Sequence, residues 1–392
     1  MTMQGSPAQP FRMPAVTKFG VGALQELPGD IAALGGTRIA IVSDKGLETA
    51  GVVDNVEALL APLSLPIIRF TDIRGEPTFK LLAEAVERLR SEGCDLVVGI
   101  GGGSAMDVAK AAAALMDKSD ITAYLSGSKP IEDRSVKCVL VPTTSGTGAE
   151  VTMNAIFGDA EKELKRGLVS PALLPDIAIV DPLLTVSCPP RVTAASGVDA
   201  FTHAIESYVA VRATPQTRMY AEQAMKEFPL HIARAVHLGG DVEARIGMSR
   251  VSHFAGISLA NAGVGAVHAL AYPLGGKFHI EHGVANALLM PFVFDVTGRA
   301  NAGRMAEVAS FLQLGDYASR PHAATDAVVE YLYRLLGELD LPSSLRELGV
   351  DEAALPQLAE QASTIDRLLS NTPYRLNQDK ILRIYRNAYQ GM

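Results

Sequence analysis

The 392-residue sequence contains no tryptophan and only three cysteines, Cys94, Cys138 and Cys188. Three widely spaced cysteines cannot form a disulfide framework or a CxxC metal site. Cys94 and Cys138 stand beside apolar, strand-like runs, and a buried cysteine behaves mainly as a small hydrophobic residue. The sequence therefore predicts structural thiols.

Long apolar runs and clusters of basic charge are also missing. No stretch approaches the roughly 18 uninterrupted apolar residues of a membrane span, and the start, MTMQGSPAQPFRMP, lacks the charged-then-apolar order of a signal peptide. The net charge of -8 is spread along the chain, which argues against nucleic acid and anionic membranes as partners. We expect a cytoplasmic protein that acts on a small molecule.

The first half of the chain alternates β-branched runs with helical stretches. Hydrophobic residues make up 48% of the sequence, enough for a large core and two domains. This alternation predicts a doubly wound, Rossmann-like α/β domain with a parallel sheet. In the stretch that precedes Gly93, Leu82, Val86 and Leu89 share one helical face, and Gly93 suits a left-handed cap. The expected strands cover residues 38–44, 66–70, 95–100, 136–142 and 177–181.

Strand signals stop at Cys188, Pro189 and Pro190, and the rest of the chain has the pattern of successive helices. We therefore expect an α/β dinucleotide-binding domain over residues 1–188. An all-helical domain for metal and substrate is expected over residues 189–392. No long linker separates them, so a cleft between the domains is the natural place for a site.

The segment DLVVGIGGGSAMDVAKAAAAL has the order strand, three glycines, helix. Gly101, Gly102 and Gly103 let the backbone approach an anion, and the helix N-terminus behind them attracts negative charge, so we expect a pyrophosphate here. Ser104 and Asp107 also fit a capping box, which would make this only a well-capped helix. The glycine-rich segment matches neither the GxGxxG motif nor the P-loop motif.

A polar loop, PTTSGTGAE at residues 142–150, follows the next expected strand at the same edge of the sheet. Thr143, Thr144 and Thr147 are candidates for hydrogen bonds to cofactor ribose and phosphate, although such residues also form ordinary turns. Asp44 ends the first strong strand, where its carboxylate can accept from a ribose hydroxyl and repel a 2′-phosphate. This favours NAD over NADP.

Histidines in the second half suggest a metal site. Asp199 and His203 are spaced i, i+4 in SGVDAFTHAIESY, so they share one helix face. His268 lies among small residues, and His282 opens the segment HGVANALLMP. Three imidazoles and one carboxylate suit a single Fe²⁺ or Zn²⁺ with a position open for a substrate oxygen.

Together GGGSAMDVAK, PTTSGTGAE, SGVDAFTHAIESY, VHALAYPLGG and EHGVANALLMP resemble the iron-containing (group III) alcohol dehydrogenase family. The resemblance runs from residue 18 to residue 350 and implies the architecture shared with dehydroquinate synthase. It places Asp199, His203, His268 and His282 on the family's four metal positions. It also implies a homodimer formed through an N-terminal hairpin at residues 18–24. Its cofactor contacts fall on Gly101, Gly102, Gly103, Ser104, Thr143, Thr144 and Lys165, with Asp44 at the position that separates NAD from NADP users.

The sequence departs from that family at Tyr272. Many members have a histidine one turn after the third ligand, where it is thought to assist proton transfer. A tyrosine can donate a proton, but its unperturbed pKa near 10 is far above that of histidine. Tyr272 and His282 are the catalytic candidates. His279, three residues before His282, is an alternative candidate for the proton transfer that the missing histidine would assist.

The expected reaction is hydride transfer between NAD(H) and an alcohol or aldehyde, with the ion as Lewis acid. Apolar residues such as Phe254 and Leu259 favour a small, uncharged substrate. A dehydroquinate synthase-like lyase would need basic residues gathered on the metal motifs, and a maleylacetate reductase-like enzyme can work without four ligands. A non-catalytic nucleotide-binding protein would show a degraded metal site, whereas all four positions are filled.

Overall fold

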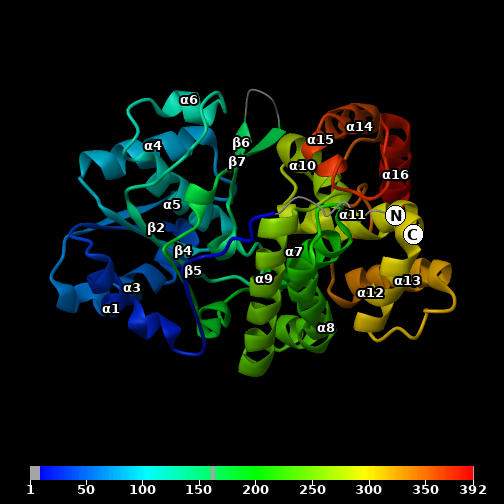
Figure 1. Ribbon diagram of the computed structural model, residues 1–392, viewed down its shortest axis with the longest axis horizontal. Coiled ribbons are helices and arrows are strands. Elements are labelled where there is room, and N and C mark those ends of the chain that lie inside the picture. The colour runs from blue at the N-terminus through cyan, green and yellow to red at the C-terminus, as the bar shows by residue number, and fades with distance from the viewer. Residues whose placement is uncertain (1–8, 160–163, 392) are drawn as a thin grey trace, which may run out of the picture.

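The computed structural model describes residues 9–159 and 164–391. Its first half is built on a parallel sheet flanked by helices, and its second half is built of helices (Figure 1).

The main sheet has six parallel strands in the order β1-β8-β5-β4-β2-β3. All five predicted strands are present. From β2 the chain runs outward to β3 and then returns to β4 on the other side of β2, so β2 and β4 flank a topological switch point, where open α/β sheets bind ligands. The strands are β1 (Val16–Phe19), β2 (Ile39–Asp44), β3 (Ile67–Ile73), β4 (Leu96–Gly101), β5 (Lys137–Pro142) and β8 (Ile177–Val180).

Helices cover both faces of this sheet, because successive side chains of a strand point to opposite sides. In β2, Ile39 and Ile41 pack with helices α1 (Leu27–Leu34) and α3 (Val52–Leu60). The intervening Ala40 and Val42 belong to the core that includes α4 (Phe79–Ser91) and α5 (Gly103–Leu115). The doubly wound α/β architecture predicted from the sequence is confirmed.

Two local predictions in this half are also confirmed. Leu82, Val86 and Leu89 are fully buried on one face of α4, and Gly93 has a left-handed φ of 71° just beyond the helix. Cys94 and Cys138 are buried, and neither forms a disulfide.

The hairpin expected at residues 18–24 is wrong. β1 pairs in parallel with β8, far along the chain, and the chain then turns through Gly20 and Gly22 into a 3₁₀ helix at Ala23–Glu26. A second sheet was not expected either: β6 (Asn154–Asp159) and β7 (Leu164–Val169) pair antiparallel.

Beyond Val180, all elements of the described residues are helical, and α7 begins at Pro190, where the first helical position has no need of a backbone N–H. These helices share one hydrophobic core. Among the described residues, no single helix has the length and apolar character to cross a membrane. Helices α9 and α10, which meet at a bend of 100°, satisfy those criteria only when taken as a pair. The helices are α7 (Pro190–Val209), α8 (Pro215–His237), α9 (Val242–Ala262), α10 (Ala266–Phe278), α11 (His282–Thr297), α12 (Ala302–Phe311), α13 (Pro321–Glu338), α14 (Leu355–Ser363), α15 (Asp366–Leu369) and α16 (Gln378–Gln390).

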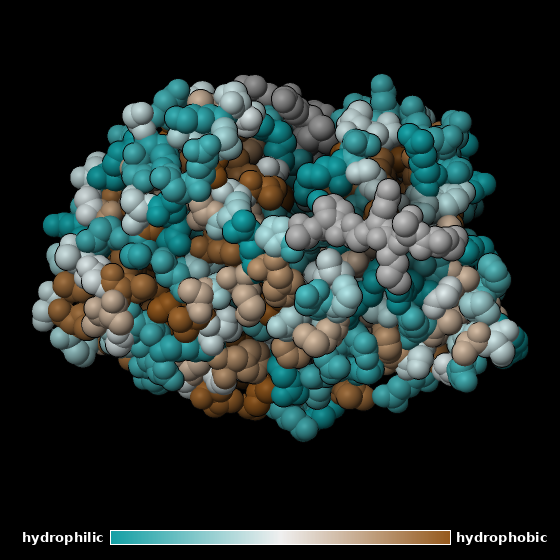
Figure 2. Space-filling view, in the orientation of Figure 1, coloured by the Kyte–Doolittle hydropathy of each residue, from teal (hydrophilic) through white to brown (hydrophobic). Residues whose placement is uncertain are grey.

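The two halves meet at the loop that follows β5. Gly148 has a left-handed φ of 60°, and a Cβ there would lie 2.5 Å from the Cα of Gly256 in α9, so only glycine permits this approach. The loop therefore joins the edge of the sheet to the helices. On the face seen in Figure 2, hydrophobic residues form small patches among hydrophilic ones.

Candidate metal and cofactor site

Three helices supply the four predicted metal ligands. Asp199 and His203 lie one turn apart on α7, His268 lies in the first turn of α10, and His282 is the first residue of α11. Helical spacing explains the α7 pair, whereas the long-range packing of α7, α10 and α11 brings the two other histidines to it.

The four donor groups converge on one point. Asp199 Oδ1 lies 3.7 Å from His203 Nε2, 3.8 Å from His268 Nε2 and 3.9 Å from His282 Nε2. One ligand atom from each of the four residues lies within 4.8 Å of all the others. Four ligands about 2.1 Å from a tetrahedral ion stand about 3.4 Å apart, so a small contraction of this set fits a divalent ion.

The charge states of the four groups also suit a cation. Burial lowers the pKa of His203 and lowers that of His282 well below its ordinary value, which keeps both imidazoles neutral. Burial alone would raise the pKa of Asp199, but attraction to His203, His282 and His268 in their protonated forms, with a hydrogen bond from Asn286, outweighs burial and brings the pKa to about 2, so the carboxyl is ionised at neutral pH. Neutral imidazoles and an ionised carboxylate are the forms that bind metal.

Access to the ligand set is one-sided. Asp199, His203 and His268 are all at least 96% buried, whereas the side chain of His282 is 28% exposed. Among the four ligand residues, His282 is therefore the one most open to a molecule approaching from outside.

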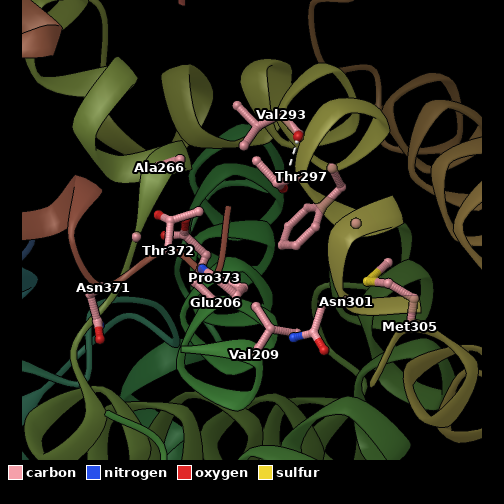
Figure 3. A pocket seen from close by; sticks show the side chains of 13 residues that line it. Glu206, Val209, Ala266, Val293, Thr297, Asn301, Met305, Asn371, Thr372 and Pro373 are labelled. Atoms are coloured by element: carbon pink, nitrogen blue, oxygen red, sulfur yellow. Dashed lines mark hydrogen bonds between the residues drawn. The ribbon is translucent and has the colours of Figure 1, made fainter. Parts of the chain in front are cut away.

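Glu206, which the sequence reasoning missed, orients one ligand. It is buried on α7, and its Oε2 accepts a hydrogen bond of 2.6 Å from His268 Nδ1, while Oε1 accepts one of 2.7 Å from the backbone N–H of Val267. A proton on Nδ1 leaves the Nε2 lone pair free for a metal. Glu206 also lines a small cavity of about 20 Å³ among α7, α10 and α11 (Figure 3).

Asn286, also missed, contacts three of the four ligand residues. It is fully buried on α11, and its Nδ2 donates to Asp199 Oδ1 at 2.7 Å. The same nitrogen lies 3.2 Å from Nε2 of both His268 and His282. Asn286 follows His282 by four residues, and Glu206 follows Asp199 by seven, so each lies on the same helix face as a predicted ligand. This spacing is the signal that could have revealed both residues.

Tyr272 lies beside the ligands, and its ring centroid is 6.1 Å from that of His282. Burial raises the pKa of its phenol, with Arg367 opposing the shift. His279 is exposed at the end of α10 with a left-handed φ of 54°. Leu259 belongs to the helical core, and Phe254 packs against Tyr220, so neither supports a substrate contact.

The cofactor candidates gather at the switch point of the sheet. A Cβ on Gly101 would lie 3.3 Å from Asp44 Oδ2, and one on Gly102 would lie 3.5 Å from Thr144 Oγ1. A Cβ on Gly103 would lie 2.6 Å from the side chain of Thr147. Three glycines, Asp44 and the loop at residues 142–150 therefore surround one place.

The capping box predicted for Ser104 and Asp107 is wrong. Helix α5 starts at Gly103 with Gly102 as its N-cap and has no side-chain cap. Asp107 instead accepts from the backbone N–H of Ile156 at 2.8 Å and pairs with Lys110 at 3.0 Å, because β6 packs beside α5. Since no side chain of the described residues caps α5, its first N–H groups are available to a ligand.

The remaining cofactor candidates occupy neighbouring positions. Ser104 lies in the first turn of α5, and the backbone N–H of Thr143 donates to the carbonyl of Gly101 at 2.9 Å, which holds the 142–150 loop against β4. Lys165 is buried on β7, pairs with Glu76 and approaches Gly275 of α10. Its charge contributes to the lowered pKa of His282, so it links the two halves at the site.

Comparison with known proteins gives matches along the whole chain. Residues 14–182 match the family model "Iron-containing alcohol dehydrogenase", and residues 193–389 match "Fe-containing alcohol dehydrogenase family, C-terminal". The chain is 40% identical over 383 residues to long-chain-alcohol dehydrogenase 1 of Geobacillus thermodenitrificans, with 96% of each chain covered. It is 33% identical to the NAD-dependent methanol dehydrogenase of Bacillus methanolicus, with 96% of this chain and 99% of that one covered. The crystal structure of a 1,3-propanediol oxidoreductase superimposes with a TM-score of 0.91 at 32% identity, covering 97% of this chain and 100% of that one.

Proposed function

Because the chain belongs to the iron-containing alcohol dehydrogenase family, we propose that it is a metal- and NAD-dependent oxidoreductase of a small alcohol or aldehyde. The observation that carries the proposal is the convergence of Asp199, His203, His268 and His282 on one point. Both matching family models describe alcohol dehydrogenases, which favours this reaction over the lyase and reductase alternatives.

The four ligand residues would hold one Fe²⁺ or Zn²⁺. The ion supplies Lewis-acid polarisation of the substrate's oxygen. Glu206 holds His268 with its Nε2 lone pair directed at the site, and the partly exposed His282 leaves the approach for substrate. The protein's own contribution is therefore to fix the donors and to limit access.

NAD would bind at the carboxyl ends of β2 and β4. The uncapped N-terminus of α5, next to Gly101, Gly102 and Gly103, suits the pyrophosphate. One oxygen of Asp44 caps α2 (Lys45–Thr49), and the other lies near Gly101, placed to accept from a ribose hydroxyl. A carboxylate there disfavours the 2′-phosphate of NADP. The name of the methanol dehydrogenase relative agrees with NAD.

The remaining candidates would complete the cofactor site from the facing loops. Ser104, Thr143, Thr144 and Thr147 offer hydroxyls for ribose and phosphate, and Lys165 offers a cation close to His282. Asp107 would act indirectly, because its carboxylate is bonded to Lys110 and to the backbone of Ile156.

Tyr272 would donate the proton when an aldehyde is reduced. Its raised pKa keeps the phenol protonated at neutral pH, so it is a donor rather than a base in the resting enzyme. In alcohol oxidation, the Tyr272 hydroxyl would pass its own proton to water as it accepts the proton released by the alcohol, so that it ends protonated again.

The predicted domains, residues 1–188 and 189–392, remain proposals, as does the homodimer. Edge strand β1 offers a surface for a second copy: Val16, Phe19 and the following Val21 are 43%, 38% and 56% exposed. An exposed apolar edge strand is a ready site for pairing. We place the dimer contact on this strand instead of on a hairpin.

Asp199→Ala and His268→Ala test the proposed site. Each variant should lose its metal and its turnover of alcohol while NAD binding changes little, because the two residues lie on the helical half. Metal analysis, NADH formation and NAD titration report these three properties separately. Full activity in metal-stripped protein would refute the proposal, and cofactor recycling without net NADH would favour a lyase.

A further inference from the structure

Asn286 makes contacts that a residue used only for packing would not need. Its side chain is fully buried one helical turn after His282, and its Nδ2 lies within hydrogen-bonding distance of three of the four ligand residues. The shortest contact, 2.7 Å, is to Asp199 Oδ1. That same oxygen faces all three imidazoles at 3.7 to 3.9 Å.

We propose that Asn286 is a positioning residue of the metal centre, which holds Asp199 Oδ1 toward the three imidazoles and thereby sets the affinity for the ion. The inference rests on the proposed function, since it presupposes a metal on this ligand set. It assigns to the carboxamide a role in metal retention and no contact with the reacting atoms.

The orientation of the amide supports this role. Asn286 Oδ1 is buried and accepts no hydrogen bond from any described residue, whereas Nδ2 has three neighbours. Turning the amide over would bring its oxygen against the Asp199 carboxylate, and two acceptors repel. The carboxylate therefore fixes the direction of the amide, and the amide fixes the carboxylate in return.

The contacts of Nδ2 act on metal binding in opposite directions. A carboxylate oxygen has two lone pairs, so Asp199 Oδ1 can accept a hydrogen bond from Asn286 and bind an ion at the same time. The second hydrogen of the NH₂ group can bond to the Nε2 lone pair of either His268 or His282, each at 3.2 Å, and that lone pair is one that the ion needs. The bond to Asp199 is shorter and charge-assisted, and such bonds are about twice as strong as neutral ones, so its effect prevails.

Asn286→Leu removes the donor and keeps a side chain of similar size. Loss of an outer partner of a metal ligand typically lowers metal affinity about 10- to 100-fold, and we expect a loss in that range for Zn²⁺. Zn²⁺ affinity is measured by competition with a chromophoric chelator on full-length, metal-stripped protein. Melting temperatures with and without Zn²⁺ give a second readout that is independent of turnover.

Asn371→Leu is the matched control. Asn371 is 2% exposed, and its Nδ2 donates to the carbonyls of Ala262 and Val264, with no contact to the four ligands. Its loss should lower the melting temperature equally with and without Zn²⁺ and leave the affinity within about threefold, since one buried hydrogen-bonding group affects stability by only about 1–3 kcal/mol.

The outcomes separate the inference from the proposed function. Wild-type protein that binds no Zn²⁺ or Fe²⁺ at these residues would overturn the proposed function itself. If the wild type binds Zn²⁺ and Asn286→Leu binds it equally or more tightly, only the inference fails. An equal loss in Asn286→Leu and Asn371→Leu would also overturn it. Should Asn286→Leu not fold, Asn286→Ala removes the same donor without adding bulk, and the same comparison applies.

Discussion

Replacing Glu206 by glutamine probes how the metal ligands are oriented. Both oxygens of Glu206 accept hydrogen bonds, one from His268 Nδ1 at 2.6 Å and one from the Val267 backbone at 2.7 Å. Glutamine has only one oxygen, so its NH₂ group must face one of these two donors. A nearly isosteric change thus creates a conflict inside a buried site.

The conflict has two possible resolutions, and each has a cost. If the NH₂ faces His268, Nδ1 must become an acceptor and the ring proton moves to Nε2, which removes the lone pair needed by the metal. If it faces Val267, a buried backbone N–H loses its partner at a cost of about 1–3 kcal/mol. Since tenfold in affinity corresponds to about 1.4 kcal/mol, we expect Glu206→Gln to bind Zn²⁺ about 10- to 100-fold more weakly.

The assay is chelator competition on metal-stripped protein, with Glu222→Gln as control. Glu222 pairs with Lys226 on the surface of α8, where an ion pair contributes little, so this variant should match the wild type. A Glu206→Gln protein that retains Zn²⁺ within twofold of the wild type would refute the assigned role of the carboxylate.

Asp44→Ser keeps a capping side chain on α2 but removes the negative charge that would repel the 2′-phosphate of NADP. Two like charges 4 Å apart at an effective dielectric constant of 20 repel by about 4 kcal/mol. The ratio of kcat/KM for NAD to kcat/KM for NADP should therefore fall at least tenfold. An unchanged ratio would mean that Asp44 does not face the ribose. Gly102→Ala adds a methyl with no atom closer than 3.5 Å, so the fold should persist while NAD affinity falls about tenfold by calorimetry and Zn²⁺ affinity stays constant. Equal NAD affinity would remove this loop from the cofactor site. Burial raises the pKa of Cys94 to about 11 and that of Cys138 to about 12, so both thiols stay protonated below those values and should resist iodoacetamide at pH 8 until the protein is unfolded. Rapid labelling in the folded state, detected by mass spectrometry, would contradict their burial.

Strand positions in the first half followed from sequence because buried parallel strands are continuous β-branched runs bounded by polar or glycine residues. β1 was not recognised, since it has only four residues and two of them, Val16 and Phe19, are exposed at the edge of the sheet. Its parallel pairing with β8 depends on contacts more than 150 residues away, which no local pattern encodes.

The ligands Asp199 and His203 were predictable because helical spacing alone puts them side by side. Glu206 and Asn286 lie on the same helical faces as predicted metal ligands. The local sequence does not distinguish a buried carboxylate or amide that contacts a ligand from one that is exposed to solvent. Their roles became visible only when α10 brought His268 against α7 and α11. The capping box failed for a similar reason, since β6 supplies a partner for Asp107 from outside the helix.

The most direct test of the central claim is metal removal and replacement in the full-length protein, followed at 340 nm with NAD and a series of primary alcohols. Chelation should abolish NADH formation while NAD binding persists, and stoichiometric Fe²⁺ or Zn²⁺ should restore it in the wild type but not in His268→Ala. NADH formation that survives complete metal removal, or that returns equally in His268→Ala, would contradict catalysis at the site formed by Asp199, His203, His268 and His282.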